Sequence, residues 1–258
     1  MAYWLLKVML TPVLRFFYRV EVKGLDEVPA HGPVIIASNH VSFIDSLFLP
    51  LVLRRRITFV AKAEYFEDRK TAWFFRAVGQ IPIKRTGGTA SEGALAAASE
   101  VLQRGGVFGI YPEGTRSPDG RLYKGHTGVA RLALQSRAPV ICAAMIGTRE
   151  VQAIGQTVPR VFMPVGIRFS PPLHFERSPA TDREEPLALR PITDEIMFRL
   201  RELSGQEYVN RYAKRRDVLE GPAESGRVAD APVREPAGVA AGTSPWPCAR
   251  SPTRSCSA

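Results

Sequence analysis

Short apolar runs alternate with helix-forming stretches along most of the chain. The runs predicted as strands or extended segments are Val34–Ala37, Ile57–Ala61, Gly79–Ile83, Val107–Tyr111, Pro139–Ile146 and Val161–Phe169. The stretches predicted as helices are Thr71–Val78, Ala90–Gln103, Thr127–Gln135 and Pro191–Leu203. Strands that alternate with helices predict an α/β fold, here a three-layer domain with a largely parallel central sheet. A chain of 258 residues is long enough for one such domain.

The two ends of the chain differ from this central part. Residues 1–20 mix Trp, Leu, Val and Phe with Lys7, Arg15 and Arg19, so no run of about eighteen apolar residues is left to span a bilayer. We therefore expect an N-terminal helical segment that lies in a membrane interface, with a core-packing helix as the alternative. Residues 21–214 are the expected α/β domain. Residues 215–258 contain few large apolar side chains, which predicts a disordered tail.

The charge of the chain indicates an anionic partner. Its formal net charge is +10 and its sequence pI is about 9.9. A lipid surface, a phosphorylated substrate or a nucleic acid would suit this charge, but no nucleic-acid-binding motif is present. The three cysteines show neither a disulfide framework nor the spacing of a metal site. Cys142 lies in an apolar run and is predicted to be a core residue.

The first polar block, Asn39–Asp45, directly follows a predicted strand. Ligands of α/β sheets bind outside the carboxyl ends of the strands, which is where this block is expected. Asp45 follows His40 by five residues and can accept a hydrogen bond from one imidazole nitrogen, leaving the other nitrogen to act as a general base. Asn39 and Ser42 of the same block are assigned to substrate binding, and Asn39 could also help to position the loop. The alternative is a structural His between capping Asn and Asp residues.

Two further polar blocks also follow predicted strands. Gly79–Arg85 ends in Lys84 and Arg85, and the planar guanidinium of Arg85 suits a phosphate, although a strand end with solvated charges is the alternative. The block Tyr111–Ser117 offers an acceptor for a hydroxyl and a donor for a phosphate or thioester oxygen. Its residues assigned to substrate binding are Glu113, Gly114, Thr115 and Arg116. The alternative is an ordinary polar loop.

A basic turn precedes the predicted helix at residues 127–135. Lys124 in this turn is assigned to substrate binding, because amides at a helix N-terminus favour an anion. His126 has no evident partner and is predicted to lie on the surface. The chain has neither a Gly-x-Ser-x-Gly elbow nor a P-loop, and its cysteines are distant in sequence from the histidines. Direct attack by an acceptor hydroxyl is therefore the simpler mechanism.

Together, and in this order, the three blocks resemble the glycerophosphate acyltransferase family, in particular its lysophosphatidic acid acyltransferases. The resemblance covers about residues 1–213. It rests on His-x4-Asp at 40–45, Gly-x-Ile-Pro-Ile-x-Arg at 79–85 and Glu-Gly-Thr-Arg at 113–116. The segment Ala138–Ala144 corresponds to a fourth block of the family but lacks its second proline, so it does not support an inference about acyl chain length.

The resemblance implies roles for these residues. His40 would deprotonate the free hydroxyl of 1-acylglycerol-3-phosphate, Asp45 would orient His40, and Arg85 with residues 113–116 would bind the glycerol phosphate. Acyl-CoA or acyl-carrier protein would be the donor, phosphatidic acid the product, and no metal or other cofactor would be needed. The protein would act at the cell membrane, peripheral or monotopic on its cytoplasmic face. The alternatives are another lysophospholipid or lipid acceptor, or a non-catalytic lipid-binding module.

Overall fold

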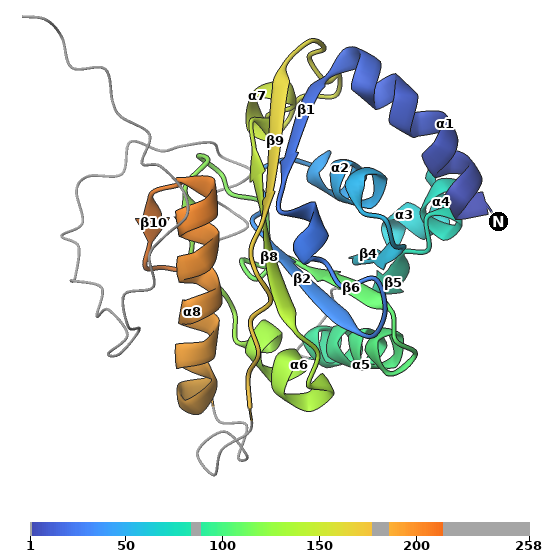
Figure 1. The fold of residues 1–258 in the computed structure, drawn as a ribbon. Helices are drawn as coiled ribbons and strands as arrows, with labels where there is room; N and C mark the ends of the chain where they lie inside the picture. Colours follow the sequence, from blue (N-terminus) through green and yellow to red (C-terminus); the bar gives the residue numbers. More distant parts are fainter. Residues whose placement is uncertain (1, 84–88, 177–185, 214–258) are drawn as a thin grey trace, which may run out of the picture.

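A computed structural model describes residues 2–83, 89–176 and 186–213. Its centre is a six-stranded sheet with the strand order β1-β9-β8-β2-β6-β3 (Figure 1). These strands are β1 Arg19–Lys23, β2 Val34–Ser38, β3 Ile57–Thr58, β6 Val107–Ile110, β8 Val140–Ile146 and β9 Pro164–Phe169. Neighbouring strands run parallel except β8 and β9, which are antiparallel. The prediction of a largely parallel sheet is confirmed.

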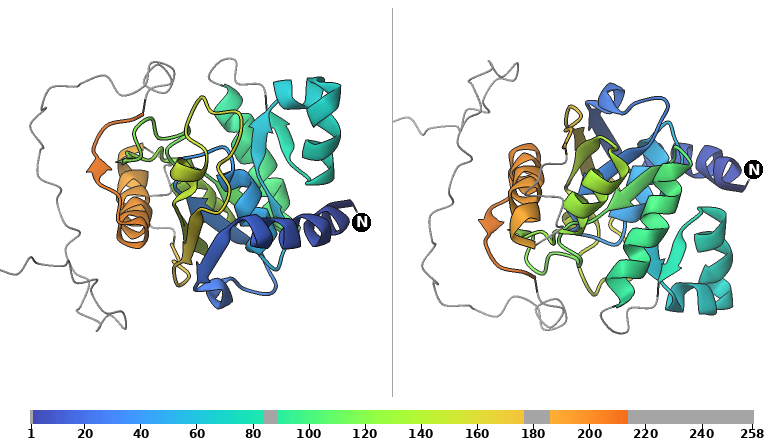
Figure 2. Two further views of the ribbon diagram at one scale, coloured as in Figure 1. Left: turned by 90° about the horizontal axis from the view of Figure 1, so that it is seen from above. Right: turned by 90° about the horizontal axis from the view of Figure 1, so that it is seen from below.

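Helices cover both faces of this sheet. The helices of the structure are α1 Ala2–Phe17, η1 Leu25–Glu27, α2 Asp45–Val52, α3 Glu64–Glu67, α4 Arg69–Ala77, α5 Thr89–Gln103, α6 Gly128–Ser136, α7 Thr148–Val151 and α8 Pro186–Ser204. Two strand pairs lie outside the sheet: β4 Val60–Lys62 with β5 Ile81–Ile83, and β7 Leu122–Tyr123 with β10 Tyr208–Val209. The views of Figure 2 place α8 and α1 on opposite sides of the sheet.

Alternate side chains of β2 separate the two halves of the core. Val34 and Ile36 pack in the cluster that contains α2, whereas Ile35 and Ala37 pack with α5, α6 and α8. All four side chains are completely buried. A strand that is apolar on both faces is expected where helices cover both sides of a parallel sheet. This packing fixes β2 and therefore the loop that follows it.

Several elements differ from the sequence prediction, among them the strand expected at Ile57–Ala61, which is divided into β3 and β4. The strand β1 was not predicted, because its alternating charged residues Arg19, Glu21 and Lys23 suit an exposed sheet edge and give little hydrophobic signal. The helix α8 begins at Pro186, five residues before the predicted start at Pro191, because Leu189 packs into the core. The last strand begins at Pro164 and leaves Val161 in a loop.

Two other expectations concern residues that the structure does not describe, and a third concerns membrane-spanning helices. The predicted disordered tail at 215–258 and the side chains of Lys84 and Arg85 lie outside the described residues. Within the described ranges, no helix combines the length and the apolar character needed to cross a membrane.

Candidate active site

Two loops meet at the carboxyl ends of β2 and β6. Residues 39–44 connect β2 to α2, and residues 111–121 connect β6 to β7. Because β2 and β6 are parallel neighbours, their loops lie side by side. The backbone N–H of Ser117 donates to the His40 carbonyl at 2.7 Å, and the N–H of His40 donates to Glu113 Oε2 at 3.2 Å. The second loop therefore holds the backbone of His40 on both sides.

His40 and Asp45 lie together as the sequence predicts. Nδ1 of His40 is 3.0 Å from Asp45 Oδ2, and this oxygen also accepts from the N–H groups of Val41 and Ser42, both at 2.8 Å. Asp45 is completely buried at the first residue of α2. Within the described part of the chain, Nε2 of His40 takes no hydrogen bond. The arrangement leaves this nitrogen for a substrate proton, which is the geometry a general base requires.

A stack of three rings supports His40 from the side. The Tyr111 ring is nearly parallel to the His40 imidazole, with ring centroids 3.9 Å apart and an angle of 13° between the planes. The Phe59 ring also stacks on Tyr111, with centroids 5.3 Å apart. The Tyr111 hydroxyl lies 2.8 Å from Ser46 Oγ. Burial raises the Tyr111 pKa well above its usual value, so the phenol stays neutral. The sequence prediction missed Tyr111, although an aromatic residue directly before Pro112-Glu113 was visible.

Glu113 has a different role from the one expected. Its carboxyl is almost completely buried and accepts from the N–H of Tyr123 at 2.8 Å as well as from that of His40. Burial raises its pKa to about 8, against the opposing effect of these two donors. The expectation that Glu113 accepts a substrate hydroxyl is corrected, because its oxygens are used within the protein. Glu113 instead ties the His40 loop to β7.

The side chains of Asn39 and Ser42 support the loop from inside the protein, as expected for Asn39. The Asn39 side chain accepts from the N–H of Met145 at 2.7 Å and donates to its carbonyl at 3.0 Å. Ser42 Oγ donates to the Gln152 carbonyl at 2.7 Å. Both side chains are completely buried, so a substrate cannot reach them without breaking these bonds. They fix the loop against β8 and the segment after α7.

The remaining predicted residues lie nearer the surface. Gly114 is exposed and has a φ of 71°, a conformation that favours glycine, while Thr115 and Arg116 are half-buried. Lys124 is half-buried, and its ammonium lies 5.6 Å from the centroid of the Tyr212 ring. His126 is exposed as predicted, but it is not without a partner, because it stacks on the same ring at 4.6 Å.

The sequence model of the family described as "Acyltransferase" matches residues 19–146. This range holds the His-x4-Asp block, the Glu-Gly-Thr-Arg block and the sheet from β1 to β8. Residues 19–146 therefore belong to this acyltransferase family. This match agrees with the resemblance to acyltransferases that the sequence motifs indicate.

The curated relatives that the chain matches share one name, 1-acyl-sn-glycerol-3-phosphate acyltransferase. The chain is 30% identical over 140 residues to the chloroplastic 1-acyl-sn-glycerol-3-phosphate acyltransferase BAT2 of Brassica napus, and the alignment covers 54% of this chain and 40% of the relative. It is 32% identical over 136 residues to the human 1-acyl-sn-glycerol-3-phosphate acyltransferase alpha, covering 51% and 48%. The chain thus spans less than half the length of these relatives.

A solved structure shows the same fold. The crystal structure of the 1-acyl-sn-glycerophosphate (LPA) acyltransferase PlsC from Thermotoga maritima aligns with a TM-score of 0.58 and 24% sequence identity. The alignment covers 76% of this chain and 80% of that one. It confirms the predicted α/β architecture beyond the residues that the family model matches.

Part of the acyltransferase site framework comes from residues after the family match. Gln206 follows α8; its Oε1 accepts from Asn39 Nδ2 at 2.7 Å, and its Nε2 donates to the Gly120 carbonyl at 2.6 Å. It thereby joins the residue before His40 to the loop that contains Glu113. No sequence signal pointed to Gln206, because it lies 167 positions from Asn39 and in no motif.

Two other chemistries find little support at this site. Cys142 is completely buried, and burial raises its thiol pKa to about 12, which disfavours a thiolate nucleophile. No group of three or more His, Cys, Asp or Glu side chains that could hold a metal ion occurs among the residues described. The His40–Asp45 pair is thus the arrangement around which a reaction can be argued.

Proposed function

We propose that this chain transfers an acyl group from a thioester to the free hydroxyl of 1-acylglycerol-3-phosphate, which yields phosphatidic acid. The observation that carries the proposal is His40, whose Nδ1 faces a buried carboxylate while Nε2 takes no hydrogen bond in the described structure. A pure lipid-binding module would need no such base. The names of the relatives, 1-acyl-sn-glycerol-3-phosphate acyltransferases, support the choice of acceptor.

The proposed reaction is a direct transfer. Asp45 holds the imidazole with its proton on Nδ1, so Nε2 can remove the proton of the glycerol hydroxyl. The hydroxyl oxygen attacks the thioester carbonyl, a C–O bond forms and the C–S bond breaks. The imidazolium then returns its proton to the leaving sulfur. The carboxylate of Asp45 stabilises the transient positive charge on His40.

The substrate contacts are assigned by charge. We propose that the phosphate of the acceptor binds Arg85 and Lys84. Three residues that the structure describes, Thr115, Arg116 and Lys124, are proposed to add further contacts to it. The donor is acyl-CoA or acyl-carrier protein, and neither a metal nor another cofactor is proposed. The net charge of +10 suits both an anionic acceptor and an anionic membrane.

An acyl-transfer assay over several acceptors tests this function. The purified protein is given acyl-CoA or acyl-carrier protein with lysophosphatidic acid, lysophosphatidylcholine or lysophosphatidylethanolamine. We expect lysophosphatidic acid to be acylated fastest. Transfer to another lysolipid alone would contradict the acceptor assignment. Lipid binding without transfer to any acceptor would instead support the non-catalytic module.

The helix α1 supports the proposed location at the membrane. Its exposed face is formed by apolar side chains: Trp4, Leu5, Val8, Met9, Val13 and Phe16. Its other face packs on α2, where Tyr3 donates to the Pro50 carbonyl and Lys7 to that of Leu53. Apolar side chains with neighbouring cations suit a helix in a membrane interface.

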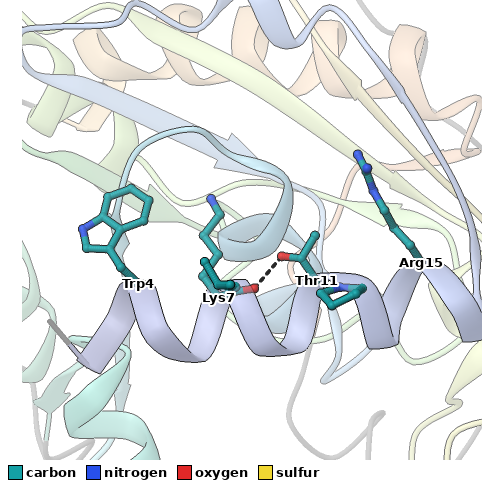
Figure 3. Close-up of a pocket in the computed structure, with 6 residues that line it drawn as sticks. Trp4, Lys7, Thr11 and Arg15 are labelled. Atoms are coloured by element: carbon teal, nitrogen blue, oxygen red, sulfur yellow. Dashed lines mark hydrogen bonds between the residues drawn. The ribbon is translucent and has the colours of Figure 1, made fainter.

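A shallow groove runs along one flank of α1. It has a volume of about 450 Å³ and is lined by Trp4, Lys7, Val8, Thr11, Pro12 and Arg15. Figure 3 shows Trp4, Lys7, Thr11 and Arg15 projecting from the same side of the helix. The exposed Trp4 indole and Arg15 guanidinium suit the headgroup region of an anionic leaflet, whereas the Lys7 ammonium is engaged with the Leu53 carbonyl. These features support our proposal that the protein acts on the membrane surface, at the cytoplasmic face of the cell membrane.

Replacing Val8, Met9 and Val13 together by Gln should weaken membrane attachment without unfolding the protein. These side chains are exposed, and burial of each in the interface would stabilise binding by about 1.5–3 kcal/mol at most. The measurement is the fraction released from isolated membranes by high salt or alkaline carbonate. We expect partial release of the unmodified chain and greater release of the variant. Equal retention of the two proteins in carbonate would show that α1 is not the interfacial element.

A further inference from the structure

We propose that residues 152–163, the loop between α7 and β9, form a second membrane contact that inserts its apolar tip into an anionic phospholipid bilayer beside α1. This inference concerns a surface rather than the reaction, and it is independent of acyl transfer. It would extend the attachment from α1 to a neighbouring loop on the same side of the protein.

The loop exposes apolar side chains that the protein itself does not cover. The exposed fractions are 78% for Val158, 63% for Phe162 and 45% for Val161. Three large apolar side chains within five residues form a local cluster rather than scattered exposure, and such clusters mark interaction sites. The sequence placed Val161 at the start of an extended segment, but the structure leaves it in this loop, before β9 begins at Pro164.

The backbone of Phe162 is held in an unusual conformation. Its φ is 62°, in the left-handed region that costs a residue with a side chain roughly 1–2 kcal/mol. The Phe162 N–H donates to the Phe17 carbonyl at 2.7 Å, and the two rings are 5.9 Å apart. The ring is nevertheless largely exposed, so this conformation presents it to the surroundings instead of burying it.

The loop continues the apolar surface of α1. Figure 1 shows the C-terminal end of α1 next to the segment that leads into β9, and Arg19 N–H donates to the Met163 carbonyl at 3.4 Å. Phe16 and Phe17 at the end of α1 are in edge contact at 5.1 Å, and Phe162 packs against the second ring. One apolar strip thus extends from the exposed face of α1 to the loop.

The charges around this strip select an anionic surface. Arg15, Arg19 and Arg160 are exposed, and none of them has an ion-pair partner among the described residues. Basic side chains that flank an apolar tip reach phosphate groups while the tip enters the acyl region. This complementarity favours an anionic bilayer as the occupant over an uncharged protein surface.

The loop is also joined to the candidate active site. Ser42 Oγ donates to the carbonyl of Gln152, the first residue of the loop, and Arg160 N–H donates to the Val151 carbonyl at 2.7 Å. Insertion of the tip would therefore bring the loop of His40 to the bilayer surface. An acceptor whose acyl chain stays in the membrane could then present its headgroup to that loop.

The test compares Phe162→Asn and Val158→Ser with a matched control, Phe198→Gln. Asn tolerates the left-handed conformation, so Phe162→Asn removes the ring and keeps the backbone. Phe198 is 38% exposed on α8, on the opposite side of the sheet from α1 (Figure 2). Binding is measured by flotation with phosphatidylcholine vesicles that contain phosphatidylglycerol, and melting temperatures confirm folding. We expect roughly tenfold weaker binding for Phe162→Asn and little change for the control.

Three outcomes would overturn the proposal. Loop variants that bind as tightly as the unmodified chain would exclude insertion of the loop. An equal loss in Phe198→Gln would show that the effect is not local. A lower transfer rate on a monomeric short-chain acceptor, with vesicle binding unchanged, would place the loop in the chemistry instead. Vesicle binding requires no turnover, so failure of the proposed function would leave this result interpretable.

Discussion

His40→Ala should reduce acyl transfer by about 100- to 10,000-fold, the usual loss when a general base is removed. The imidazole is the group that the buried carboxylate of Asp45 and the ring of Tyr111 hold in place, and its Nε2 takes no other hydrogen bond in the described structure. The side chain is 16% exposed, so its removal leaves a small, partly solvated space. We therefore expect the variant to fold.

The matched control for this prediction is His31→Ala. His31 is exposed and precedes β2, so it lies at the opposite end of that strand from His40. The measurement is the single-turnover rate with lysophosphatidic acid and an acyl thioester, together with the melting temperature. A folded His40→Ala protein with the rate of the His31→Ala control would contradict the proposed mechanism.

The central pair of the site was predictable because it depends on one short segment. His40 and Asp45 are joined by a loop between a buried strand and a helix, and the strand signal at Val34–Ala37 was clear. The approach of the Glu113 loop was also predictable in outline, since both loops follow parallel strands. Local pattern and parallel topology were sufficient for this much.

The direction of each polar side chain was not predictable in the same way. Asn39, Ser42 and Glu113 were expected to face a substrate, but burial turns each of them toward backbone groups that would otherwise lack partners. A sequence motif gives the type of each residue, but it does not show whether the side chain hydrogen-bonds to the protein backbone or to a substrate. Tyr111 and Gln206 were missed because their contacts join segments distant in sequence.

Asp45→Asn should be as severe as the loss of His40, by about 1,000- to 10,000-fold in turnover. Asp45 Oδ2 accepts from His40 Nδ1 and from two backbone N–H groups, while Oδ1 is buried and has no partner among the residues that the structure describes. If the amide nitrogen of Asn took the Oδ2 position, it would face the two N–H donors. It would also force the imidazole proton onto Nε2, and the base would be lost.

The opposite orientation of the amide does not restore activity. The Asn oxygen could then accept the same three hydrogen bonds, but the neutral amide could not stabilise the imidazolium, and its NH2 group would be a buried donor without a partner. The control is Asp26→Asn, because Asp26 is 86% exposed and pairs only with the exposed Arg54 among the described residues. Turnover and unfolding of both variants are compared with the unmodified protein. If folded Asp45→Asn kept the turnover of the Asp26→Asn control, Asp45 would only support the loop and would not orient the base.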